Sequence, residues 1–200
     1  MSHQSITNHQ HTPLNRAARA GSLECVNWLL FVAPEALRET ASVTTLDMAA
    51  RSGNLELLQW LMCQCRQEAQ QKPTQKTVVM AARSGNLKMC QWLMQSRSGI
   101  PGKKANQAML NAAARSGCQP LVEWLVHTKQ PNSVMRIRQT TFIAACQSGN
   151  LACMEWVWQQ QGKHNNDQLC INTKTLESTI ASQRLKSIKW LLSRSVKIDH

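Results

Sequence analysis

Apolar positions in residues 45–61 follow a helical period that is interrupted once. The segment reads T-L-D-M-A-A-R-S-G-N-L-E-L-L-Q-W-L. Leu46, Ala49 and Ala50 fall on one face of a short first helix, and residues 52–54 (Ser-Gly-Asn) end it. A second apolar helical face is then marked by Leu57, Leu58, Leu61 and Met62. The pattern predicts a helical hairpin that is too small to bury its own apolar face, so neighbouring hairpins must cover it.

The same segment recurs along the chain at a constant spacing. Glycines 32 residues apart stand at Gly21, Gly53, Gly85, Gly117 and Gly149. Tryptophans with the same spacing stand at Trp28, Trp60, Trp92, Trp124 and Trp156, and Trp190 follows 34 residues later. This repetition predicts one all-α solenoid of about six helix–turn–helix repeats, with a core that extends from hairpin to hairpin.

The register of the repeats also predicts the domain organisation. We expect a disordered lead-in at residues 1–11, a single repeat domain at 12–195 and a tail at 196–200. The repeats run approximately over 12–43, 44–75, 76–107, 108–139, 140–172 and 173–195. In the last repeat Thr179 and Ile180 replace an alanine pair and Gln183 replaces the glycine, so we interpret it as a C-terminal cap. The connectors are long, polar and rich in Gln and Lys, and weak strand alternation predicts few or no β-hairpins.

Two stretches of the repeat resemble the ankyrin-repeat family. Residues 12–18 read T-P-L-N-R-A-A, which resembles the family's T-P-L-H-x-A-A opening, and A-A-R-S-G-N-L-E-L-L-Q-W-L resembles its continuation. The resemblance extends over residues 12–192, although Asn15, Asp47 and Asn111 stand where the family has histidine. It implies stacked helix pairs with irregular loops that act as a non-enzymatic scaffold for protein–protein interaction. The tryptophan–leucine ending resembles divergent arrays of intracellular bacteria, protists and large viruses, which implies a host-directed effector as one possible role.

The cysteines bear on localisation. Cys25 and Cys153 occupy the position of Leu57, and Cys146 that of Ala50, so we expect small buried thiols in a reducing compartment. No apolar run reaches the ~18 residues of a membrane span, and residues 1–11 lack the apolar segment of a secretory signal. The expected location is the cytoplasm, or the host cytoplasm or nucleus for a secreted effector.

Net charge favours an anionic partner. The chain has 23 basic and 11 acidic residues, a net charge of +12. A protein with an acidic surface and a nucleic acid both satisfy this charge, and a structural module of a larger assembly is a third alternative. No phosphate-binding loop, nucleophile elbow or zinc-protease motif occurs, so we expect neither enzyme activity nor a cofactor. Cys63 and Cys65 lack a second ligand pair at zinc-finger spacing, so we expect no metal site.

A column of polar residues follows the alanine pairs and is the candidate binding site. The resemblance places these positions on the concave face, where partners of the family bind. Its members are Arg19, Arg51, Ser52, Arg83, Ser84, Arg115, Ser116 and Gln147. With helices ~10 Å apart, the four arginines would form a basic stripe ~30 Å long for carboxylates or phosphates. The alternative is a simply solvated face. We interpret the tryptophan column as packing rather than as a base-stacking ladder.

Overall fold

The computed structural model describes residues 12–35, 40–64, 72–95, 105–128, 135–163 and 168–195. The predicted lead-in at 1–11, the predicted tail at 196–200 and the middle of each connector lie outside the described residues, as does Cys65.

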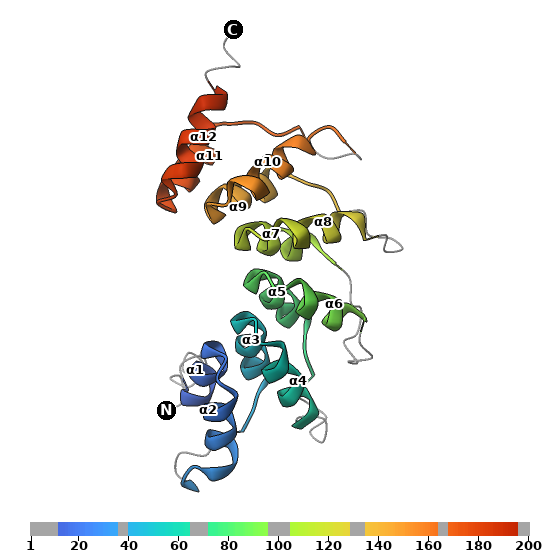
Figure 1. The fold of residues 1–200 in the computed structure, drawn as a ribbon, viewed down its shortest axis with the longest axis vertical. Helices are drawn as coiled ribbons and strands as arrows, with labels where there is room; N and C mark the ends of the chain where they lie inside the picture. Colours follow the sequence, from blue (N-terminus) through green and yellow to red (C-terminus); the bar gives the residue numbers. More distant parts are fainter. Residues whose placement is uncertain are drawn as a thin grey trace, which may run out of the picture. The chain divides into compact units, whose positions relative to one another are not determined.

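The described residues form twelve α-helices and one π-helical turn, and these ranges contain no strand (Figure 1). The helical pairs are α1 (Pro13–Ala20) with α2 (Leu23–Asn27), α3 (Val43–Ser52) with α4 (Leu55–Gln64), α5 (Gln75–Ser84) with α6 (Leu87–Gln95), α7 (Gln107–Ser116) with α8 (Gln119–His127), α9 (Gln139–Ser148) with α10 (Leu151–Gln159), and α11 (Thr173–Ala181) with α12 (Leu185–Ser195). The π-helical turn η1 (Trp28–Val32) directly follows α2. The predicted all-α fold of six helical hairpins is confirmed.

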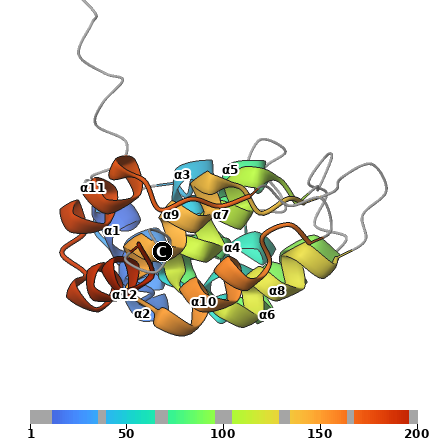
Figure 2. The ribbon, with the colours of Figure 1, turned by 90° about the horizontal axis from the view of Figure 1, so that it is seen from above.

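The hairpins are grouped in two compact units, Met1–Lys103 and Lys104–His200. In the first unit α1, α3 and α5 pack side by side. In the second unit α7, α9 and α11 pack in the same way, with α10 and α12 on one side of them (Figure 2). We call α1, α3, α5, α7, α9 and α11 the inner helices and their hairpin partners the outer helices.

A left-handed glycine and an asparagine make the turn within a hairpin. After α3, Gly53 has a φ of 82°, a conformation that favours glycine, and its N–H donates to the Ala50 carbonyl at 3.3 Å. Asn54 then caps α4, because its Oδ1 accepts from the Leu57 N–H at 3.0 Å. The Nδ2 of Asn54 also donates to the Gly21 carbonyl of the preceding hairpin at 2.9 Å. Equivalent bonds join Asn86 to Gly53 at 2.8 Å and Asn150 to Gly117 at 2.9 Å.

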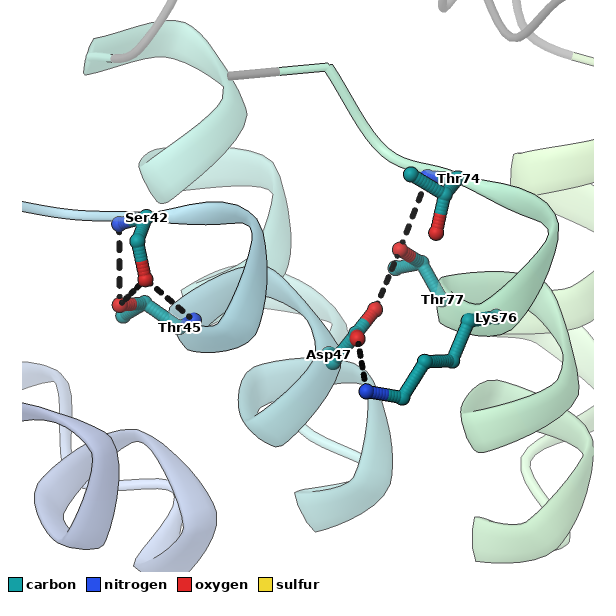
Figure 3. Close-up of polar contacts among 6 residues, drawn as sticks. All are labelled: Ser42, Thr45, Asp47, Thr74, Lys76 and Thr77. Carbon is teal, nitrogen blue, oxygen red and sulfur yellow. Dashed lines mark hydrogen bonds and ion pairs between the residues drawn. The ribbon is translucent and has the colours of Figure 1, made fainter. Parts of the chain in front are cut away.

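A second polar bridge joins neighbouring inner helices near their N-terminal ends. Asp47 is only 2% exposed, accepts a 2.7 Å hydrogen bond from Thr77 Oγ1 and pairs with Lys76 Nζ at 3.1 Å (Figure 3). Thr77 also supports its own helix, because its Oγ1 accepts from the Thr74 N–H at 3.0 Å. Equivalent 2.8 Å bonds run from Thr45 to Asn15 and from Thr141 to Asn111. Positions 15, 47 and 111 therefore act as hydrogen-bond acceptors between repeats.

Small and branched aliphatic residues are the most numerous residues of the fully buried core. The alanine pairs at 49–50, 81–82 and 113–114 have no exposed surface, and the same holds for Leu57, Leu58 and Leu61. Trp60 and Trp92 are partly buried. Trp28 departs from the interpretation of the tryptophan column as packing, since it is 46% exposed. Its ring belongs to the first described hairpin, and no described hairpin precedes it.

The cysteine prediction holds for some positions and not for others. Cys90, Cys146 and Cys153 are buried, and desolvation raises the pKa of Cys146 and of Cys153 to about 12, so both remain neutral thiols at pH 7. Cys25, by contrast, is exposed, so its predicted burial is wrong. It lies in the same first hairpin as Trp28. The position in the repeat is the one that Leu57 occupies, but burial there depends on a neighbouring hairpin.

The last hairpin does not have the closed outer surface that we expected of a cap. Ile180, which replaces the second alanine of the pair, is 56% exposed, and Leu185 and Leu192 are 61% and 49% exposed. A capping repeat ordinarily has a polar outer face. This hairpin instead carries exposed apolar side chains on both of its helices. The cap interpretation stays a prediction.

Candidate partner-binding surface

The arginine column lies at the C-terminal ends of inner helices. Arg19, Arg51, Arg83 and Arg115 are in the last turns of α1, α3, α5 and α7. A cation in this place is stabilised by the negative end of the helix dipole. Because α1, α3 and α5 pack side by side, the first three arginines occupy equivalent places on adjacent helices of the first unit. Arg115 belongs to the second unit.

The positive charges of Arg19 and Arg83 act on Arg51, which lies between them in the row. Arg19 and Arg83 are exposed, whereas Arg51 is partly buried. The pKa of Arg51 is lowered from its ordinary value, first by desolvation and then by the positive charges of Arg19 and Arg83. Among the described residues, neither of the two ion pairs involves these arginines. Arg51 is therefore the middle member of an uncompensated cationic row.

The serines beside the arginines have a local structural role. Ser52 Oγ donates to the Ala49 carbonyl at 2.7 Å and accepts from the Asn54 N–H at 3.2 Å. Ser84, Ser116 and Ser148 make the same 2.7 Å bond to the carbonyl three residues earlier. Their hydroxyls help to end the inner helices, and the side chains stay short beside the arginines.

In the second unit the column of polar residues continues with one arginine and then a glutamine. Arg115 is exposed at the end of α7, and the equivalent residue of α9 is Gln147. The Oε1 atom of Gln147 is buried and accepts no hydrogen bond from the described residues. Such an atom is costly to leave unsatisfied.

Sequence reasoning missed three residues on the face that carries the arginine row. Arg16, Met48 and Met80 each stand three residues before an arginine of the row, on the same side of α1, α3 and α5. Arg16 is exposed, and both methionines are partly exposed. The 32-residue spacing from 16 to 48 to 80 was a signal that could have identified this second row. We call the six residues together the Arg–Met face: Arg16, Arg19, Met48, Arg51, Met80 and Arg83.

The charge balance of these three helices is strongly positive. They contain five basic side chains and one acidic side chain, Asp47. Asp47 is buried and paired with Lys76, so it does not offset the charge of the arginine row. A carboxylate of another molecule would therefore not have to compete with an exposed acidic side chain of these three helices for the arginines.

Comparison with known proteins identifies the family. A model described as "Ankyrin repeat" matches residues 9–36, and one described as "Ankyrin repeats (3 copies)" matches residues 46–135. The chain belongs to the ankyrin-repeat family. The human ASB11 ankyrin repeat domain, known from a crystal structure, matches with a TM-score of 0.51 at 16% identity and covers 92% of this chain and 83% of its own. A search of curated proteins gave no match.

Membership of the ankyrin-repeat family indicates a general kind of function. Ankyrin repeats generally mediate protein–protein interaction, and the fold is typically a non-enzymatic module. In the described part of this ankyrin chain, no group of three His, Cys, Asp or Glu side chains is placed to hold a metal ion. No described helix is long and apolar enough to cross a membrane.

Proposed function

We propose that this ankyrin array binds an acidic protein segment through the arginines at the ends of its inner helices. Arg19, Arg51 and Arg83 form the main contact row of the first unit, and Arg115 and Gln147 are the candidate contact residues of the second unit. Ser52, Ser84 and Ser116 leave space for the partner, since they are short and already bonded within their own turns.

The observation that supports the proposal most is the state of Arg51. Its charge is partly desolvated and lies between two like charges, with no carboxylate of the described residues in an ion pair with it. A guanidinium in this situation gains more from a bound carboxylate than a fully solvated one does, and it accepts a carboxylate through two parallel hydrogen bonds. The partner would thus offset a repulsion that exists in the free protein.

The test compares two charge-reversal variants of the full chain. Arg51→Glu/Arg83→Glu/Arg115→Glu should abolish capture of the native partner, because several charges that face one acidic segment act together. Lys88→Glu/Lys186→Glu/Lys189→Glu changes the net charge equally, but its three exposed lysines lie on outer helices α6 and α12, so binding should persist. Capture from cell extract is measured by mass spectrometry, with a melting curve for each variant.

Two results would contradict the proposal. The first is a folded arginine variant that captures the same proteins as wild type. The second is capture that unrelated DNA or RNA removes completely, since this would favour nucleic-acid binding, the alternative that the net charge also allows.

A further inference from the structure

We infer that the Arg–Met face recognises an acidic segment that also carries apolar side chains, rather than a purely polyanionic one. The inference rests on the proposed function and specifies the chemistry of its partner. It depends on the second row of the face, where Met48 and Met80 stand beside Arg51 and Arg83.

The two rows differ in what they can bind. In the arginine row Arg19, Arg51 and Arg83 supply positive charge that forms no ion pair with a carboxylate of the described residues. In the second row Met48 and Met80 are partly exposed on adjacent helices, so each leaves apolar surface in contact with water. Methionine side chains are flexible and polarisable, which suits contact with apolar groups of varied shape. A partner that satisfies both rows must bring carboxylates and apolar groups together.

The methionine row is confined to the first unit. The equivalent residues of α7 and α9 are Ala112 and Ala144, which are 9% and 2% exposed. Alanine at these positions offers almost no apolar contact surface. The arginine is also replaced by Gln147 at the end of α9. The second unit therefore lacks the combination of charge and apolar surface, so the mixed segment of the partner should contact the first unit.

Helix spacing sets the pattern that the partner needs. Packed helices lie 8–10 Å apart. A peptide in the polyproline II conformation has three residues per turn and advances about 3.1 Å per residue, so every third side chain points to the same face at intervals of about 9 Å. Carboxylates at every third residue would therefore match Arg19, Arg51 and Arg83. The methionines lie three helical residues away, about 4.5 Å along each helix axis. Apolar residues between the carboxylates can reach them when the peptide lies across the three helices.

The experiment uses two synthetic peptides of equal length and charge with the full chain. The first has Glu at every third position with Leu between, and the second has Gln in place of each Leu. The wild type should bind the leucine peptide on the order of tenfold more tightly in calorimetry, because partly exposed apolar surface becomes buried. In Met48→Gln/Met80→Gln this preference should disappear, while the affinity for the glutamine peptide stays unchanged.

A matched control separates a local effect from a general one. Met62→Gln/Met94→Gln changes two partly exposed methionines on outer helices α4 and α6, and it should keep the preference for the leucine peptide. If wild type binds both peptides equally, or if the control loses the preference as well, the inference is overturned and the proposed function stands. If neither peptide binds wild type, the inference and the acidic-partner proposal both fall.

Discussion

Single polar side chains link the repeats, and Asp47 is the most informative of them. It is almost fully buried, yet it has both a hydroxyl donor in Thr77 and a cation in Lys76 (Figure 3). A buried carboxylate that loses such partners is strongly destabilising. The other acceptors at this position are Asn15 and Asn111, which carry no charge. The hydrogen bond rather than the charge is therefore the shared element of the bridge.

Two substitutions at Asp47 separate these contributions. Asp47→Asn should keep the acceptor for Thr77 and lose only the ion pair with Lys76, whose side chain is 53% exposed. We expect a loss below about 1 kcal/mol in free energy of unfolding. Asp47→Val removes the acceptor and should cost about 1–3 kcal/mol. Urea denaturation measures both. Equal stability of Asp47→Val and wild type would show that the bridge does not stabilise the array.

These bridges were only partly predictable from the sequence. The spacing of Thr45, Thr77 and Thr141 follows the 32-residue register and was available as a signal. The pattern could not predict the hydrogen-bond partner of each side chain, because a helical period shows only which face of the helix a residue lies on. The same limit applies to Arg51, whose position was predicted but whose partial burial depends on its packed surroundings.

At the scale of elements, the sequence predicted where the helices end better than it predicted which of their side chains are buried. Glycine marks the end of five of the six inner helices directly in the sequence, and asparagine follows it in three of them, because the backbone preferences of these residues are local. Exposure of Trp28, Cys25 and Ile180 was not predicted, because burial depends on which hairpins lie next to them. The π-helical turn over residues 28–32 was also missed, since its apolar residues are compatible with an ordinary α-helical pattern.

At the position that follows an inner helix, removing a glycine and introducing one should change the stability of the chain in opposite directions. Gly53 has a φ of 82°, so Gly53→Ala should cost about 1–2 kcal/mol from left-handed backbone strain. In the last hairpin Gln183 holds a φ of 57° without being glycine. Gln183→Gly should therefore stabilise the chain by about 0.5–1 kcal/mol, after allowance for the more flexible unfolded state. Thermal and urea unfolding measure both variants, and a destabilised Gln183→Gly protein would contradict the strain argument.

At the scale of the whole molecule, both kinds of polar bridge are interrupted at two places in the sequence. Bonds from Asn54, Asn86 and Asn150 to a preceding glycine carbonyl recur, but Cys118 stands at the equivalent position in the fourth repeat. The bonds from a threonine to an asparagine or aspartate of the preceding repeat also recur. Between the third and fourth repeats, however, Val79 occupies the acceptor position and Met109 the donor position. Neither side chain can make such a hydrogen bond. These substitutions fall between the third and fourth repeats, where the chain divides into its two compact units. The second interruption lies between the fifth and sixth repeats, where Ile143 and Arg184 occupy the acceptor and asparagine positions.

Coupling between repeats determines whether an array unfolds in one step, since each repeat is stabilised by its neighbours. We expect the wild type to unfold in urea in two steps, one for residues 1–103 and one for 104–200, so that the curve of helical circular dichroism against urea concentration shows two transitions. A wild type that unfolds in a single transition would contradict this prediction, because it would show that the two units unfold together.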